Sequence, residues 1–196
     1  MTRLGWIILA LILAGGASFW SMTSFGAADG RTDRATRSPP SRGEAATDGE
    51  ALVVPVAGVA RRALRSSWGD AREGGARAHH GLDVAAAAGT PVIAAAAGRI
   101  DKLFQSARGG ITLYVRSPDG RWSYYYAHLA RYVDGIREGM MVRAGDRLGY
   151  VGDTGDAGAG NYHLHFGMAR MRAGDRWWQG EDVDPYPLLA SGRPPS

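Results

Sequence analysis

The segment ITLYVRSPDGRWSYYYAHL, residues 111–129, indicates the fold class most clearly. Its two halves, Ile111–Arg116 and Trp122–Ala127, are rich in β-branched and aromatic residues, which favour strands. Between them, Ser117-Pro118-Asp119-Gly120 is typical of a β-turn, because proline presets the backbone at the second turn position. The segment therefore predicts two antiparallel strands joined as a hairpin.

Similar short apolar runs, divided by Gly, Pro and Asp, occur on both sides of this hairpin. They predict further strands at Pro91–Ala94, Arg99–Phe104, Arg147–Val151 and Leu164–Met168. Only Val56–Ser66 has a plausible helical pattern. Glycine contributes 29 of 196 residues, about twice its usual share of roughly 7%, which suits many tight turns. We therefore expect a mostly β domain built from antiparallel strands.

The first 50 residues differ from the rest of the chain. Residues 1–28 hold a long apolar run followed by small residues, which fits a signal peptide cleaved after Ala28. The apolar stretch at 4–22 is also long enough for an uncleaved membrane anchor, so both interpretations stay open. Residues 29–50 are rich in Ser, Thr, Gly and Pro and predict a disordered linker. A single domain is then expected over 51–190, followed by a tail at 191–196.

The composition excludes several classes of site and partner. The chain has no cysteine, which excludes disulfides, thiol nucleophiles and zinc–thiolate sites, so a metal site must use histidine and carboxylate. From residue 51 onward there are 18 basic and 14 acidic residues, which account for the whole net charge of +4. This weak positive charge suits an anionic membrane or cell-wall polymer. No basic run interleaved with aromatic residues is present, so nucleic acid is not an expected ligand.

Two short motifs hold four of the five histidines. In a strand, residues two apart point to the same face, so His163 and His165 project together. His79 and Asp83 likewise share one face of an extended chain, with Gly81 leaving room between them. Imidazole nitrogen and carboxylate oxygen are ligands that zinc accepts at about 2.0–2.2 Å. Each pair alone could be an exposed strand face or a turn; together they predict a metal or proton-transfer site.

These motifs resemble those of one known family. His79-His80-Gly81-Leu82-Asp83 resembles the H-x-G-x-D motif of the lysostaphin/LytM-type zinc metallopeptidases, and His163-Leu164-His165-Phe166 resembles their H-x-H motif. Three intervening segments match in the same order: Gly89-Thr90-Pro91-Val92, Tyr126-Ala127-His128-Leu129 and Gly152-Asp153-Thr154-Gly155. The resemblance covers about Ser67 to Met168, with Val183-Asp184-Pro185 as a candidate closing segment.

The resemblance implies a compact antiparallel β-sheet or sandwich of the duplicated hybrid motif type. It implies that His79, Asp83 and His165 bind one zinc ion per chain, with water as the fourth ligand. His128 and His163 would then be the catalytic histidines, although the sequence does not decide which is the general base. His80 matches a variable position. The implied activity is hydrolysis of peptide bonds in peptidoglycan by an exported protein, periplasmic or in the cell envelope, free or anchored to the outer face of the cytoplasmic membrane. We expect a monomer.

Three other functions are compatible with parts of the sequence. A catalytically inactive family member that regulates another wall hydrolase is the main alternative, although such proteins typically lose zinc ligands. A sugar-transport phosphocarrier domain shares a similar His segment but lacks the H-x-H strand. A third alternative is a wall-binding module that uses Trp177-Trp178 as a platform, although we expect these two residues to be buried closing aromatics.

Overall fold

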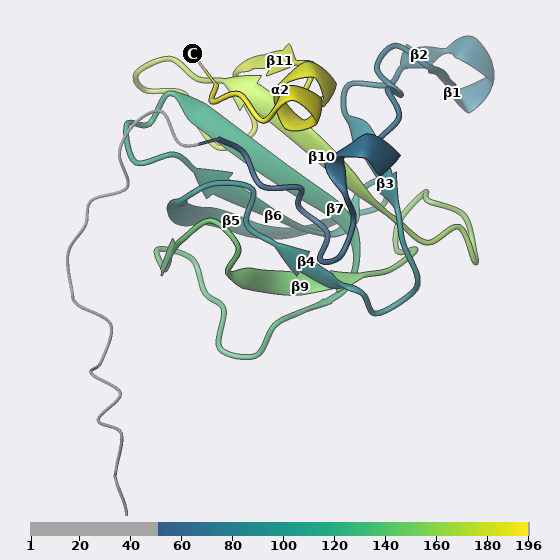
Figure 1. The fold of residues 1–196 in the computed structure, drawn as a ribbon, viewed down its shortest axis with the longest axis horizontal. Coiled ribbons are helices and arrows are strands. Elements are labelled where there is room, and N and C mark those ends of the chain that lie inside the picture. The colour runs from purple at the N-terminus through teal and green to yellow at the C-terminus, as the bar shows by residue number, and fades with distance from the viewer. Residues whose placement is uncertain (1–50, 196) are drawn as a thin grey trace, which may run out of the picture. The chain divides into compact units, whose positions relative to one another are not determined.

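Strands dominate residues 51–195, the part of the chain that this computed structural model describes (Figure 1). The predicted targeting segment 1–28 and linker 29–50 lie outside the described residues. In chain order the elements are the 3-10 helix η1 (Arg61–Ala63), β1 (Ala71–Arg72), the 3-10 helix η2 (Glu73–Gly75), β2 (Arg77–Ala78), β3 (Leu82–Ala85), β4 (Pro91–Ile93), β5 (Gly98–Ser106), β6 (Gly110–Arg116), β7 (Trp122–Tyr132), β8 (Met141–Val142), β9 (Arg147–Val151), β10 (His163–Arg170), β11 (Glu181–Val183) and the helix α2 (Tyr186–Ser191).

One antiparallel sheet organises these elements. Within residues 51–195 it has nine strands. Six of them lie side by side in the order β11-β10-β7-β6-β5-β8. Strand β3 pairs with β10, β9 pairs with β7, and β4 pairs with β9. Strands β1 and β2 form a separate small hairpin. The prediction of a mostly β, antiparallel fold is confirmed.

Each predicted strand overlaps an observed one, and the predicted hairpin joins β6 to β7. In its turn, the Ser117 backbone N–H donates to the Trp122 carbonyl oxygen at 2.9 Å. Gly120 has φ 75°, a left-handed conformation that glycine adopts without steric cost. The turn residues therefore fix the register of the two long strands.

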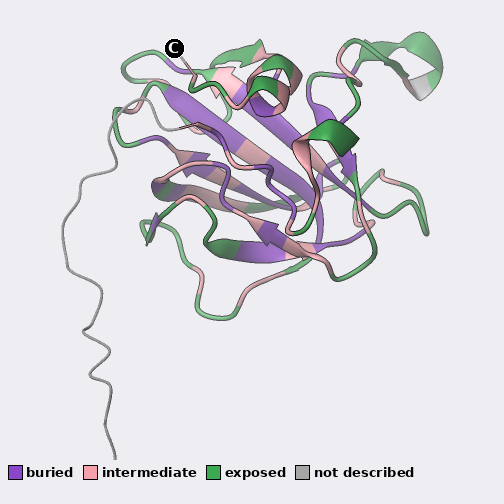
Figure 2. Cartoon of the chain, in the orientation of Figure 1, coloured by how far each residue is buried: buried purple, intermediate pink, exposed green. Residues whose placement is uncertain are grey.

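The core lies against one face of β7 and β10, and both strands are buried along most of their length (Figure 2). Tyr126 and Phe166 are fully buried and their rings meet edge to face at 5.2 Å. The Tyr126 hydroxyl accepts a hydrogen bond from the Ala95 backbone N–H at 2.8 Å. Because side chains alternate along a strand, the opposite face of the same two strands carries Tyr125 and His165.

The helix predicted for Val56–Ser66 is wrong, because only the three residues of η1 are helical there. The preceding segment is instead extended along β4: the Val53 N–H donates to the Ala95 carbonyl oxygen at 2.8 Å, and Val56 forms a β-bridge with Val92. Helix α2 was not predicted, since its six residues are too few to show a helical period.

The two adjacent tryptophans are not both buried as expected. Trp177 is half-buried, whereas 54% of Trp178 is exposed. The prediction that they close the core is therefore wrong for Trp178. No helix within residues 51–195 combines the length and the apolar character needed to cross a membrane.

Candidate active site

The two histidine motifs meet where β3 pairs with β10. The register places Asp83 directly opposite His165. Their neighbours along both strands are buried in the core: Leu82, Val84, Leu164 and Phe166. Because side chains alternate along a strand, the Asp83 carboxylate and the His165 imidazole both point to the face of the sheet that lies away from the core.

His79 completes this group. Its Nε2 lies 3.1 Å from Asp83 Oδ1 and 2.8 Å from His165 Nδ1. Its Nδ1 lies 2.6 Å from the carbonyl oxygen of Ser67. A proton on Nδ1 satisfies that carbonyl and leaves the Nε2 lone pair facing the cluster. The Ser67 hydroxyl also accepts the Asp83 backbone N–H at 3.0 Å, so Ser67 orients two members of the group.

Gly81 is required for the close approach of the two motifs. A Cβ atom at this position would lie 2.5 Å from His165 Cε1, closer than non-bonded carbon atoms pack. The space that a side chain at position 81 would fill is therefore occupied by the imidazole of His165.

The three side chains fit a zinc ion in number, type and spacing. Their donor atoms lie within 4.8 Å of one another, and the measured separations are 2.8–3.1 Å. Tetrahedral zinc with bonds of about 2.0–2.2 Å spaces its ligands about 3.3–3.6 Å apart, so an outward shift of a few tenths of an ångström suffices. Two imidazoles and one carboxylate are a ligand set found in zinc peptidases.

The protonation states of the cluster also suit a cation. Burial alone would raise the pKa of the Asp83 carboxyl, but hydrogen bonds and charge interactions with His165 and His79 outweigh it and hold this pKa well below its usual range. Burial lowers the pKa of the His165 imidazole. The carboxylate is thus ionised and the imidazole neutral near pH 7, which are the forms that bind metals.

Arg72 of β1 holds the second oxygen of the Asp83 carboxylate. Oδ1 faces His79 and His165, while Oδ2 accepts a charge-assisted hydrogen bond from the Arg72 guanidinium. One oxygen is thereby directed toward the histidines and the other is held away from them. No sequence motif indicates this contact, because it joins two strands that are not paired with each other.

We expect Arg72→Met to weaken zinc binding by about 10- to 100-fold, the usual loss when a group that orients a metal ligand is removed. Competition with a coloured chelator measures the affinity. Arg62→Met, at an exposed position of η1, is the matched control and should bind zinc like the unchanged protein. Equal affinity in the Arg72 variant would exclude this orienting role.

His128 reaches the same face through a distortion of β7. Between the pairs Ile111–Leu129 and Leu113–Tyr126, β7 has one residue more than β6, which defines a β-bulge. His128 has φ 60° and is the one non-glycine residue with positive φ between residues 51 and 195. Such a conformation costs about 1–2 kcal/mol. A strained residue held in place by its surroundings is a frequent feature of active sites.

Thr154 fixes the bulge and the imidazole together. Its hydroxyl donates to the Leu129 carbonyl oxygen at 2.8 Å and accepts the Ile111 N–H at 3.0 Å. Its own carbonyl oxygen lies 2.8 Å from His128 Nδ1. The proton of His128 is therefore placed on Nδ1, and Nε2 is left to act as a base.

We expect Thr154→Val, which keeps the shape but removes the hydroxyl, to lower the free energy of unfolding by about 1–3 kcal/mol, since the Ile111 N–H loses its acceptor. Denaturant unfolding measures the change. Thr90→Val removes a hydroxyl that only donates within an exposed turn and should change stability by no more than about 0.5 kcal/mol. Equal effects of the two substitutions would argue against the bridging role of Thr154.

His163 stands beside His128. Their rings are 4.9 Å apart, and both residues are 7% exposed. His163 Nδ1 is anchored on the Asn161 carbonyl oxygen at 2.8 Å, and its Nε2 lies 3.8 Å from Asp83 Oδ1. Burial, followed by the neighbouring histidines, lowers the pKa of His128 despite its bond to the Thr154 carbonyl, so this imidazole is neutral near pH 7.

All five predicted site residues line one cavity of about 260 Å³. Three arginines that no sequence motif indicates, Arg72, Arg77 and Arg108, also line it, as does Asp156. His80 lies outside this cavity: it stacks on Trp68 at 5.2 Å and bonds to Asp182 Oδ2 at 2.8 Å. The structure thus brings together the five residues selected from sequence and separates His80 from them.

The chain is similar in sequence to known bacterial peptidases. The L-Ala--D-Glu endopeptidase of Bacillus subtilis (strain 168) is 36% identical over 131 residues, which are 64% of this chain and 39% of that protein. Lysostaphin from Staphylococcus simulans is 32% identical over 114 residues, 58% of this chain and 22% of lysostaphin. The chain therefore spans two fifths or less of the length of these relatives.

The fold is also similar to that of a solved structure. The catalytic domain of lysostaphin from Staphylococcus simulans superposes with a TM-score of 0.55 at 28% identity, covering 66% of this chain and 94% of that domain. The model of peptidase family M23 matches residues 77–185, more than half of the chain and a stretch that includes all five clustered residues. The ordered motifs, the β fold and this match together show that the chain belongs to peptidase family M23.

Proposed function

We propose that this protein is a zinc-dependent endopeptidase that hydrolyses peptide bonds of bacterial peptidoglycan. The observation that carries the proposal is the meeting of a three-residue metal cluster, His79, Asp83 and His165, with two anchored imidazoles in one cavity. An inactive regulator of another hydrolase would not need all five side chains in this arrangement. The enzyme is therefore favoured over that alternative.

The chain's own residues supply binding and proton transfer. When bound, zinc supplies Lewis acidity, which acidifies water and polarises a peptide carbonyl. His128 and His163 hold their protons on Nδ1 and present Nε2 to the cavity. One imidazole takes a proton from the attacking water, and the other stabilises the developing oxyanion or protonates the leaving amine.

Two observations support a peptidoglycan substrate. The relatives are named for an L-Ala--D-Glu bond and as lysostaphin. The net charge of +4 and two of the three arginines lining the cavity, Arg77 and Arg108, suit a polymer whose peptides carry carboxylates. Digestion of purified thin and thick bacterial walls, followed by mass spectrometry of the released fragments, identifies the bond. Intact peptides in both digests would contradict the proposal.

We also propose that the enzyme works outside the cytoplasmic membrane, since its substrate lies there. The apolar segment 1–28 would direct export, as a cleaved signal or as an anchor. A fusion of residues 1–50 to a reporter that is active only after export tests this proposal. An inactive reporter that accumulates in the cytosol would show that the segment is not an export signal.

A further inference from the structure

A row of aromatic rings leads away from the metal cluster. Tyr125 lies 5.8 Å from the His165 ring, Tyr114 lies 4.6 Å from Tyr125, and Trp177 lies 4.9 Å from Tyr114. Trp178 ends the row, 5.1 Å from Trp177. The rings come from β10, β7, β6 and the loop between β10 and β11. They connect the proposed catalytic centre to the exposed indole of Trp178.

Small residues of β10 leave a trough beside this row. After His165, the positions on the same face are Gly167 and Ala169, which pair with Tyr125 and Ser123 of β7. A cavity of about 380 Å³ lies here and shares Tyr125 and His165 with the active-site cavity. The trough is thus continuous with the proposed catalytic centre.

Ser123 provides an independent sign that a ligand binds in this trough. Its side chain is only 3% exposed, and its hydroxyl has no hydrogen-bond partner in the described part of the chain. Burying an unpaired hydroxyl costs free energy, and such groups are rare in native structures. Ser123 lines the 380 Å³ cavity, so a ligand lying there could provide the missing hydrogen bond.

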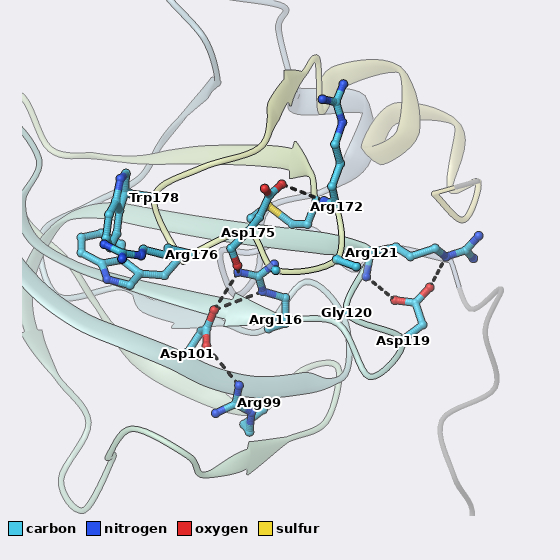
Figure 3. A pocket seen from close by; sticks show the side chains of 14 residues that line it. Arg99, Asp101, Arg116, Asp119, Gly120, Arg121, Arg172, Asp175, Arg176 and Trp178 are labelled. Atoms are coloured by element: carbon cyan, nitrogen blue, oxygen red, sulfur yellow. Dashed lines mark hydrogen bonds and ion pairs between the residues drawn. The ribbon is translucent and has the colours of Figure 1, made fainter.

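Beyond the trough, Trp177 and Trp178 also line a larger cavity of about 770 Å³ (Figure 3). Its charged residues are of both signs, five arginines and three aspartates: Arg99, Arg116, Arg121, Arg172, Arg176, Asp101, Asp119 and Asp175. Figure 3 shows Arg176 beside Trp178, with its guanidinium 5.1 Å from the indole centre. Arg116 and Asp101 form a largely buried ion pair at 3.0 Å.

This lining fits a saccharide better than a simple anion. The aspartates would repel a purely anionic ligand, whereas carboxylates and guanidiniums together accept from and donate to sugar hydroxyls. A half-exposed indole offers a flat apolar surface with a polar rim, which suits the apolar face of a pyranose ring. The net positive lining also tolerates a carboxylate carried by the sugar.

Resting on the proposed function, we propose that the trough and the Trp178 cavity bind the glycan strand of peptidoglycan while the attached peptide enters the metal centre. Trp178 stacks on a sugar ring, and Ser123 hydrogen-bonds to the strand within the trough. Apart from His165, which borders both cavities, this saccharide site uses residues outside the proposed catalytic set, and it selects the polymer over a free peptide.

Binding measurements test the proposal without relying on cleavage. The probes are insoluble peptidoglycan, glycan strands freed of peptides and stem peptides freed of glycan. We expect Trp178→Ala to weaken binding to the first two by about tenfold, the effect of losing one stacked ring, and to leave stem-peptide binding unchanged. Trp178→Phe should retain most of the affinity. Met140→Ala removes another exposed apolar side chain, 38% exposed and outside the linings of the three cavities described above, and should bind like the unchanged protein.

Unaltered glycan binding in Trp178→Ala would overturn the saccharide site, and so would a loss confined to stem peptides. Thermal unfolding checks that each variant is folded. Cleavage of stem peptides is measured separately. A protein that cleaves them but binds glycan independently of Trp178 refutes only the saccharide site. A protein that binds glycan through Trp178 but cleaves nothing refutes only the proposed function.

Discussion

Asp83→Ala should strip the metal from the protein and abolish hydrolysis. Asp83 is the one anionic member of the cluster, and its Oδ1 lies 3.1 Å from both His79 Nε2 and His165 Nδ1. Losing an outer partner of a metal ligand costs about 10- to 100-fold in affinity, and we expect the loss of the ligand itself to exceed that range. Elemental analysis of the purified variant measures the metal directly.

The matched control for this experiment is Asp156→Ala. Asp156 lines the same cavity, and its Oδ1 lies 4.0 Å from His128 Nε2, but it is outside the metal cluster. This variant should keep one zinc per chain. Full zinc occupancy in Asp83→Ala would refute the assigned ligand set, whereas loss of zinc in both variants would point to a general effect of charge in the cavity.

The second large effect is expected from the two catalytic histidines. His163→Ala and His128→Ala should each keep the metal and lose about 10²-fold or more in kcat, the usual contribution of a positioned acid or base. Both imidazoles are anchored through Nδ1 on backbone carbonyls, and neither belongs to the three-residue cluster. Paired measurements of zinc content and turnover on the same samples separate catalysis from metal binding.

Two outcomes would contradict this division of roles. Near-normal turnover in either variant would remove that histidine from catalysis. Loss of zinc in His163→Ala would instead make His163 a ligand, since its Nε2 lies 3.8 Å from Asp83 Oδ1. His80→Ala is the control for metal content, because His80 bonds to Asp182 outside the active-site cavity and its loss should leave the zinc in place.

Local periodicity predicted the parts of this site that depend on one strand. The alternation of His163 and His165 with Leu164 and Phe166 is a property of β10 alone, and the latter two are buried in the structure. The hairpin at Ser117–Gly120 likewise follows from the turn residues themselves. Such features could be predicted because the residues that cause them are neighbours in sequence.

Features that depend on distant contacts were not predictable in the same way. The left-handed backbone of His128 follows from a bulge against β6 that Thr154 stabilises from 26 residues away. Arg72 of the separate β1–β2 hairpin reaches Asp83 of β3 through a contact between unpaired strands. Neither contact produces a periodic pattern in the sequence, because its two residues belong to different elements. The exposure of Trp178 was unpredictable for the same reason. The conformation of the loop decides whether Trp177 or Trp178 is covered by other residues.

Zinc-dependent release of new amino groups from purified peptidoglycan tests the central claim most directly. The protein is assayed as isolated, after removal of metal with a chelator, and after return of one equivalent of zinc. The account predicts cleavage in the first sample, none in the second and recovery in the third. Cleavage that continues unchanged in the metal-free protein, or no cleavage by the fully zinc-loaded protein, would contradict it.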